Sequence, residues 1–132
     1  MIARNAIGFI AATAAVGSLL AVGNPAAHAD SWTKLWQSQI SKDYLQGHGR
    51  WVSQGDKLPA GSRMARGVFY CSGGGPAELT VLDLDSGQQG TKDYDCDGNR
   101  HYTPVVAYHN GETVKLILKS PQTTTVEEWA GR

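Results

Sequence analysis

The chain has no excess of either charge. Twelve Lys and Arg side chains balance twelve Asp and Glu side chains over 132 residues, and the basic ones are interleaved with acids. Proteins that bind nucleic acid normally carry a basic patch or stripe, so the sequence predicts no nucleic-acid partner. Because 41% of the residues are apolar, the chain has enough hydrophobic side chains to bury a core. Its length suits one domain.

The familiar catalytic motifs are missing as well. The sequence contains neither G-x-S-x-G, the turn that presents a nucleophilic serine, nor the metal-binding H-E-x-x-H. Gly73-Gly74-Gly75 precedes Pro76 and a β-rich run, not the Lys-Ser and helix of a phosphate loop, so it predicts a turn. Glu127 and Glu128 are neighbours that would face opposite sides of a strand, so they cannot act there as a paired acid and base. We expect a protein that is not an enzyme and has no catalytic residues.

Only one hydrophobic run approaches membrane-spanning length, and it lies at the start of the chain. Arg4 precedes an almost wholly apolar stretch at 6–22, and Ala27-His28-Ala29 matches the small-x-small pattern that signal peptidase reads. We predict a cleaved secretory signal peptide over 1–29 and a mature chain that begins at Asp30. The alternative is an uncleaved membrane anchor, but the run is short and diluted by Gly, Ser and Thr. The mature protein should be secreted, to the extracellular space or cell envelope, without a membrane span.

Cysteine is scarce, and both copies lie in the predicted mature chain. An even cysteine count in an exported protein indicates a disulfide, here Cys71 with Cys96. A zinc site is less favoured because the two residues lack C-x-x-C spacing. We expect a structural bond that stabilises the fold without taking part in redox chemistry.

Short extended runs separated by turn residues fill most of the mature chain. This regular spacing of turn residues predicts one mainly β domain over 30–132, a small antiparallel β-sandwich. Asn110-Gly111 lies between two apolar runs and predicts a two-residue hairpin. The expected strands are 49–53, 62–71, 77–85, 92–96, 102–108, 112–119 and 124–129.

The predicted disulfide constrains how the strands are arranged. If 62–71, 77–85 and 92–96 formed a simple meander, the cysteines would flank one middle strand at roughly 9 to 10 Å. A disulfide needs Cα atoms within about 7 Å. We therefore expect two layers, with the disulfide joining one sheet to the other.

One segment has helical periodicity. Trp32, Leu35, Trp36, Ile40 and Tyr44 follow the spacing of one helix face. This pattern predicts a short N-terminal helix over 31–45, within an arm at 30–47. The apolar stripe is expected to pack on the domain, although contact with a membrane or a partner is the alternative.

An acidic segment resembles the opening of a calcium loop. Asp93, Asp95 and Asp97 precede Gly98 in the pattern D-x-D-x-D-G, but the twelfth position is proline and flanking helices are missing. If the preceding strand pairs so that Asp83 lies opposite Asp93, then Asp83 and Asp85 would add carboxylates. We predict a calcium site at Asp93, Asp95 and Asp97 with Asp83 or Asp85 assisting. The alternative is a solvated acidic hairpin.

Export, a disulfide and the lack of catalytic motifs together favour a non-catalytic binding module. We expect it to recognise a protein or a glycan and to be a monomer. Aromatic side chains in the expected strands would either stack on a ligand or fill the core. These are Trp51, Phe69, Tyr70, Tyr102, Tyr108 and Trp129.

Two other functions stay open. A secreted protease inhibitor would present a rigid loop, for which 58–62 (Leu-Pro-Ala-Gly-Ser) is the best candidate because proline restrains it. A small secreted hydrolase would use His101 or His109 with a nearby aspartate.

Overall fold

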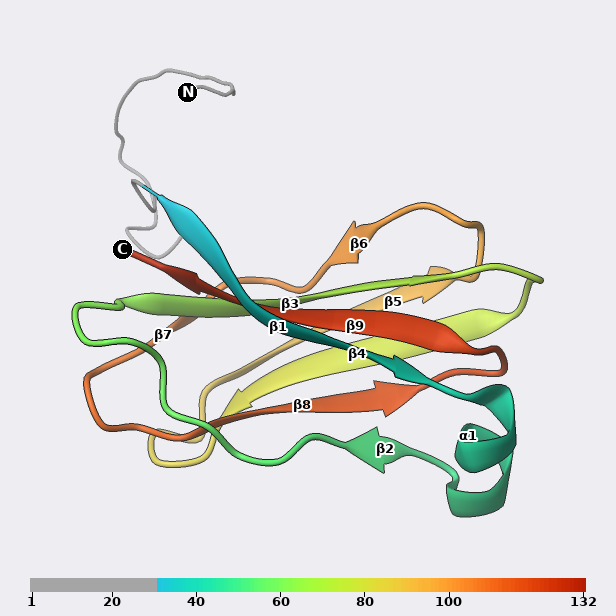
Figure 1. The fold of residues 1–132 in the computed structure, drawn as a ribbon, viewed down its shortest axis with the longest axis horizontal. Helices are drawn as coiled ribbons and strands as arrows, with labels where there is room; N and C mark the ends of the chain where they lie inside the picture. Colours follow the sequence, from blue (N-terminus) through green and yellow to red (C-terminus); the bar gives the residue numbers. More distant parts are fainter. Residues whose placement is uncertain (1–30) are drawn as a thin grey trace.

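A computed structural model describes residues 31–132, so the predicted signal peptide at 1–29 and the predicted mature start lie outside the described residues. Strands dominate, with one short helix among them (Figure 1). The elements are β1 (Trp32–Ile40), α1 (Lys42–His48), β2 (Trp51–Val52), β3 (Met64–Cys71), β4 (Pro76–Asp83), β5 (Gln89–Asp95), β6 (His101–Tyr102), β7 (Val106–Ala107), β8 (Val114–Lys119) and β9 (Thr124–Gly131). No helix in this part of the chain is long and apolar enough to cross a membrane.

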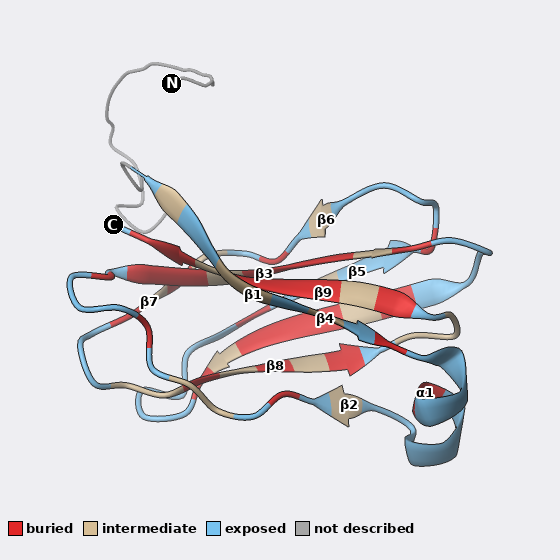
Figure 2. Cartoon of the chain, viewed as in Figure 1, coloured by how far each residue is buried: buried red, intermediate tan, exposed pale blue. Residues whose placement is uncertain are grey.

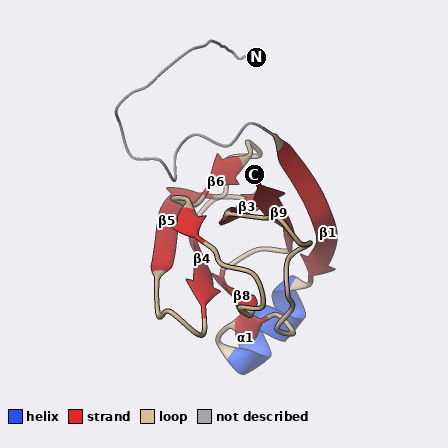
Figure 3. Ribbon diagram, turned by 90° about the vertical axis from the view of Figure 1, so that its left-hand side faces the viewer, coloured by secondary structure: helices blue, strands red, loops and turns tan. Residues whose placement is uncertain are grey.

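Two antiparallel sheets make the body of the protein. The first sheet has the order β1-β9-β3-β6, with β7 also paired to β3, and the second has the order β2-β8-β4-β5. The sheets lie on either side of the interior, and α1 lies at one end beside β2 (Figures 1 and 3). This arrangement confirms the prediction of a small antiparallel β-sandwich with a short helix.

The core forms where the inward-facing residues of the two sheets meet. Alternation along β8 buries Val114, Leu116 and Leu118 completely, and β3 contributes the fully buried Phe69 (Figure 2). At Gly67 the sheets approach so closely that an added Cβ would lie 2.7 Å from a Leu79 methyl group. A side chain at Gly67 would therefore require the buried side chains of Leu79 and Leu116 to move.

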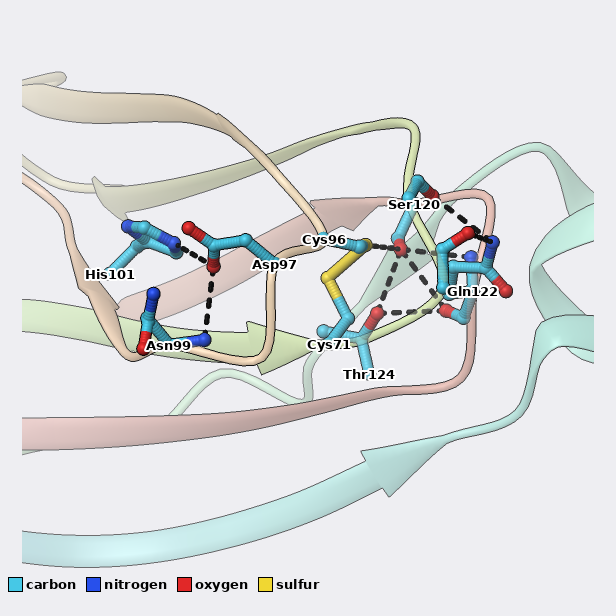
Figure 4. Close-up of a disulfide and its surroundings, with 10 residues drawn as sticks. Cys71, Cys96, Asp97, Asn99, His101, Ser120, Gln122 and Thr124 are labelled. Carbon is cyan, nitrogen blue, oxygen red and sulfur yellow. Dashed lines mark hydrogen bonds and ion pairs between the residues drawn. A yellow bond between two sulfur atoms is a disulfide. The ribbon is translucent and has the colours of Figure 1, made fainter.

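The disulfide joins the two layers, as predicted. Cys71 ends β3 in the first sheet, whereas Cys96 directly follows β5 in the second, and their Cα atoms are 4.6 Å apart (Figure 4). Backbone hydrogen bonds reinforce this junction, because the Gly98 amide donates to the Cys71 carbonyl at 2.7 Å. The segment after β5 is thus fixed against the end of β3.

The predicted helix over 31–45 is wrong for most of its length. Residues Trp32–Ile40 form β1, which pairs with β9 throughout, and only Lys42–His48 is helical. The reason is a bulge between Lys34 and Trp36, which interrupts the strand alternation. Leu35 and Trp36 both pack against the core as a result, and this imitates the spacing of a helix face.

The predicted hairpin at Asn110-Gly111 is wrong in its pairing. A turn does form there, since the Glu112 amide donates to the His109 carbonyl at 3.1 Å. However, β7 pairs with β3 in the first sheet, whereas β8 pairs with β2 and β4 in the second. The turn therefore connects the two layers and does not join neighbouring strands.

Replacing both cysteines by serine should lower the free energy of unfolding by about 3 to 4 kcal/mol. The physical reason is that the bond closes a loop of 25 residues and restricts the unfolded chain. Urea unfolding of the Cys71→Ser, Cys96→Ser variant measures the difference, and the reduced wild-type protein is the matched control. Two reactive thiols in the denatured, unreduced protein would contradict the expectation.

Candidate functional site

A layer of side chains covers the outer face of the first sheet. Ala65, Phe69 and Cys71 of β3 point into the core, so Arg66, Val68 and Tyr70 point outward. Val68 has no exposed surface even though it lies on this outer face. Longer side chains from β1, β6, β9 and the segment before β6 must therefore cover it.

An ion pair holds part of this layer in place. Glu127, which points outward from β9, accepts two hydrogen bonds from the Arg100 guanidinium, both at 2.7 Å. The Trp129 indole donates a third at 2.8 Å. Hydrogen bonding to Arg100 is the main cause that lowers the pKa of Glu127, and the same contact raises the pKa of Arg100. Glu127 is 1% exposed, so its charge depends on this partner.

Arginine and aromatic side chains alternate across the face. The Arg66 guanidinium lies 4.2 Å from the ring centre of Trp32 and 4.8 Å from that of Tyr102. Arg100 lies 5.8 Å from the centre of Tyr102 and 5.5 Å from that of Tyr70. These five residues form what we call the aromatic–arginine row, held by cation–π contacts.

A shallow depression lies where the row ends at Tyr70. Its floor crosses three strands, because Gln39 of β1 pairs with Thr125 of β9, which pairs with Tyr70 of β3. It has a volume of about 440 Å3, and its lining includes no carboxylate. The remaining lining residues are Lys42, Cys71, Ser72, Gly98, Gln122 and Thr123. The polar side chains of the lining are therefore hydroxyls, amides and one lysine.

The rim of the depression is ordered by hydrogen bonds beside the disulfide. The Gln122 side-chain amide donates to the carbonyls of Gly73 and Gly74 at 3.1 and 3.0 Å. The Thr124 hydroxyl donates to the Ser120 hydroxyl at 2.8 Å, close to Cys96 (Figure 4). The predicted glycine turn thus holds the side chain of Gln122, one of the lining residues, in place.

Histidine is paired with an acid at both candidate hydrolase positions. His101 Nε2 lies 2.8 Å from Asp97 Oδ1, and the ring of His101 stacks on Tyr94. The hydrogen bond with His101 is the main cause that lowers the pKa of Asp97 to about 2. His109 faces Glu112, not an aspartate, at 3.4 Å. Within residues 31–132, no serine, threonine or cysteine side chain hydrogen-bonds to either ring, so neither pair is joined to a nucleophile.

The strand register that added carboxylates to the calcium site is wrong. Asp93 lies opposite Glu78, not Asp83, because the β4–β5 turn begins at Asp83. Asp83 is buried and accepts hydrogen bonds from the amides of Asp85 and Ser86, and Asp85 accepts one from Thr113.

In the described part of the chain no three acidic, His or Cys side chains are grouped so that they could hold a metal ion. A calcium site at Asp93, Asp95 and Asp97 stays a prediction. A calcium-dependent rise in melting temperature that is lost in Asp95→Asn is its test.

The candidate inhibitor loop is a tight corner. The Ser62 amide donates to the Pro59 carbonyl at 3.0 Å, which closes a turn. The Leu58 amide donates to the Tyr108 hydroxyl at 3.0 Å, and Leu58 and Ser62 are buried. Only the three residues 59–61 are exposed, so the corner offers little contact surface.

The interior contains a pair of carboxyl groups that sequence reasoning missed. Glu128 of β9 points inward, beside Asp56 in the connection from β2 to β3. Both carboxylate oxygens of Glu128 and one of Asp56 are buried without a hydrogen-bond partner in residues 31–132. Burial, followed by the charge of Asp56, raises the pKa of Glu128 to about 9. Burial also raises the pKa of Asp56, while the nearby Trp36 acts in the opposite direction on both.

The aromatic side chains divide between core and surface. Phe69 and Tyr108 are buried in the core, and Trp51 packs against the core and meets Trp36 edge-on. Only Tyr70, Tyr102 and Trp129 of the candidate aromatic set reach the outer face. Strand alternation in the sequence could have predicted that these three residues share an outer face. The contact between Trp32 and Arg66 could not be predicted without knowing which strands are neighbours.

Comparison of the chain with known protein families, curated proteins and solved structures finds no match.

Replacing Glu128 by glutamine should remove a pH dependence of stability. An unfolded glutamate titrates near pH 4.3, whereas Glu128 titrates at about 9 in the folded protein. Between these values the folded state binds more protons, so the free energy of unfolding falls as pH rises. The stabilisation is complete below pH ~4 and lost by pH ~9.

Urea unfolding at pH 5 and pH 8.5 measures this slope. Between these two pH values the free energy of unfolding of the wild type should fall by more than about 1 kcal/mol, which is the value of one pKa unit. The free energy of unfolding of Glu128→Gln should fall by much less. Asp93→Asn, an exposed carboxylate on β5, should keep the wild-type slope. Equal slopes in wild type and Glu128→Gln would disprove the buried-pair assignment.

Proposed function

We propose that the protein is a small exported, non-catalytic binding module that recognises a glycan through the outer face of its first sheet. The observation that carries the proposal is the depression at Gln39, Tyr70 and Thr125, whose lining contains amide and hydroxyl side chains, one lysine and one aromatic ring. Amides and hydroxyls both donate and accept hydrogen bonds, as sugar hydroxyls do. An aromatic ring can pack on the apolar face of a sugar ring.

The distribution of exposed apolar groups favours a glycan over a protein partner. Protein interfaces usually have a desolvated apolar centre. The large hydrophobic side chains that are exposed in residues 31–132 belong to five different elements or connections and do not gather on one of them. They are Tyr44, Val52, Leu84, Tyr94 and Tyr102.

Export rests on the predicted signal peptide, with the disulfide as a consistent feature. Disulfides persist mainly in oxidising compartments. A glycan-binding module would then meet its ligand in the cell envelope or outside the cell. The protease-inhibitor alternative has less support, because only the short corner at 59–61 is exposed.

Gln39→Ala and Tyr70→Leu should each weaken glycan binding at least about tenfold, equivalent to 1.4 kcal/mol. Both substitutions remove groups from the floor of the depression. Binding of the secreted protein to a panel of purified cell-wall and extracellular polysaccharides, followed by calorimetry on those retained, measures the effect. Tyr94→Leu is the matched control, since Tyr94 is an exposed tyrosine on β5 in the second sheet.

Two results would overturn the proposal. One is that no polysaccharide is retained, and the other is that Tyr94→Leu weakens binding while Gln39→Ala and Tyr70→Leu do not. A protein partner would instead appear as an envelope protein retained by the wild type and lost in the Tyr70 variant.

A further inference from the structure

Arg66 lies on the outer face against two aromatic rings and has no acidic partner in residues 31–132. Its guanidinium lies between the rings of Trp32 and Tyr102, 4.2 and 4.8 Å from their centres. The side chain is half-buried, and its Nε is fully buried with no hydrogen-bond partner in residues 31–132. Two rings that bracket a planar group fix its orientation before any ligand arrives.

Strand register makes room for this arrangement. Gly131 of β9 pairs with Trp32 of β1 on one side and with Met64 of β3 on the other. Because Gly131 has no side chain, the Trp32 ring can reach across β9 to Arg66. The guanidinium of this β3 residue thus contacts rings from two other elements, β1 and β6.

The face around Arg66 has more positive than negative charge. Lys34, Arg66 and Arg100 share it with one carboxylate, Glu127, which already accepts hydrogen bonds from Arg100 and Trp129. Lys34 donates to Gln37 at 2.7 Å. The ion pairs in residues 31–132 link Arg100, His101 and His109 to acids, and none includes Arg66.

An uncompensated, partly desolvated cation favours an anionic ligand. Burial is the main cause that lowers the pKa of Arg66; Tyr102 acts in the opposite direction, and the neighbouring Arg100 lowers the pKa further. A carboxylate that approached the guanidinium would recover Coulombic energy and could form two parallel hydrogen bonds. This contact would be stronger than on an exposed arginine because the surroundings are less polar.

We propose that Arg66 binds the carboxylate of an acidic sugar, so that the ligand of the outer face is a glycan that contains uronic acid. The aromatic–arginine row connects Arg66 to the depression at Tyr70 through Tyr102 and Arg100. A glycan seated in the depression can therefore extend along the row and place a carboxylate at Arg66. This inference rests on the proposed function and specifies its substrate class.

The test compares each acidic glycan with its own neutral form. Oligogalacturonate and a hyaluronan oligosaccharide are titrated into the secreted protein by calorimetry, beside the same compounds with their carboxyl groups reduced to primary alcohols. For at least one of the two pairs, wild type should bind the acidic form at least tenfold more tightly. Its affinity for that form should fall as salt concentration rises.

Variants separate a binding role of Arg66 from a packing role. Arg66→Gln should bind the acidic form no better than the reduced form, and its affinity for the reduced form should equal that of wild type. Arg66→Lys, which keeps the charge but not the planar fork, should fall between them. Arg50→Gln removes an exposed arginine between α1 and β2 and should leave both affinities unchanged.

Each outcome decides a different point. Equal affinity of wild type for acidic and reduced forms overturns this inference and leaves the proposed function standing. If Arg66→Gln and Arg66→Lys each lose the same affinity for the acidic and the reduced form, Arg66 has a packing role only. A lowered melting temperature of both variants would then accompany the loss. No binding of any of the four compounds, together with no retained polysaccharide in the wider panel, overturns both proposals. If only neutral polysaccharides are retained, the inference about Arg66 is overturned and the proposed glycan-binding function stands.

Discussion

The disulfide between Cys71 and Cys96 sets the course of the segment that leads to β6. Cys96 is attached to the end of β3, and the Gly98 amide is bonded to the Cys71 carbonyl. The chain must then turn back along β3, which places Arg100 over the outer face of the first sheet, within reach of Glu127. A bond between the layers thus positions a charged side chain on the outside, and the cation–π contacts of Arg100 depend on it.

Two adjacent glutamates on β9 have opposite protonation preferences because the pleat of the strand points them to opposite faces of the sheet. Glu127 points outward and is stabilised as an anion by Arg100, whereas Glu128 points inward and is pushed toward its neutral form by burial and Asp56. Both side chains are almost wholly buried, so burial alone does not decide the protonation state. Arg100 compensates the charge of Glu127, whereas burial without a cation, followed by the charge of Asp56, favours the neutral form of Glu128.

Local sequence patterns predicted the strands and the layers better than the connections between them. Turn residues and alternation located most strands, and the distance limit on Cys71 and Cys96 predicted two layers. The helix at 31–45 failed because the bulge after Lys34 brings Leu35 and Trp36 to the core in succession. A bulge adds one residue to a strand, and its apolar spacing then resembles that of a helix.

The candidate site was harder to predict for a different reason. The register between β4 and β5 depends on the side chain of Asp83, which caps the turn through the amides of Asp85 and Ser86. The aromatic–arginine row depends on β9 lying between β1 and β3, although β1 and β9 are at opposite ends of the described chain. Alternation tells which residues share a face of one strand, but it does not tell which strands are neighbours.

A binding site on a sheet face differs physically from one on loops. Loops adapt to a ligand and lose conformational entropy when they do so. Here the floor residues Gln39, Thr125 and Tyr70 are fixed by paired strands, and Arg66 is fixed between two rings. Such a surface can bind groups that interact weakly, such as sugar hydroxyls, because its side chains lose little conformational entropy when the ligand binds. In the proposed site, specificity then depends on the few groups whose bonding is incomplete, among them Arg66, a half-buried cation that has no acidic partner in residues 31–132.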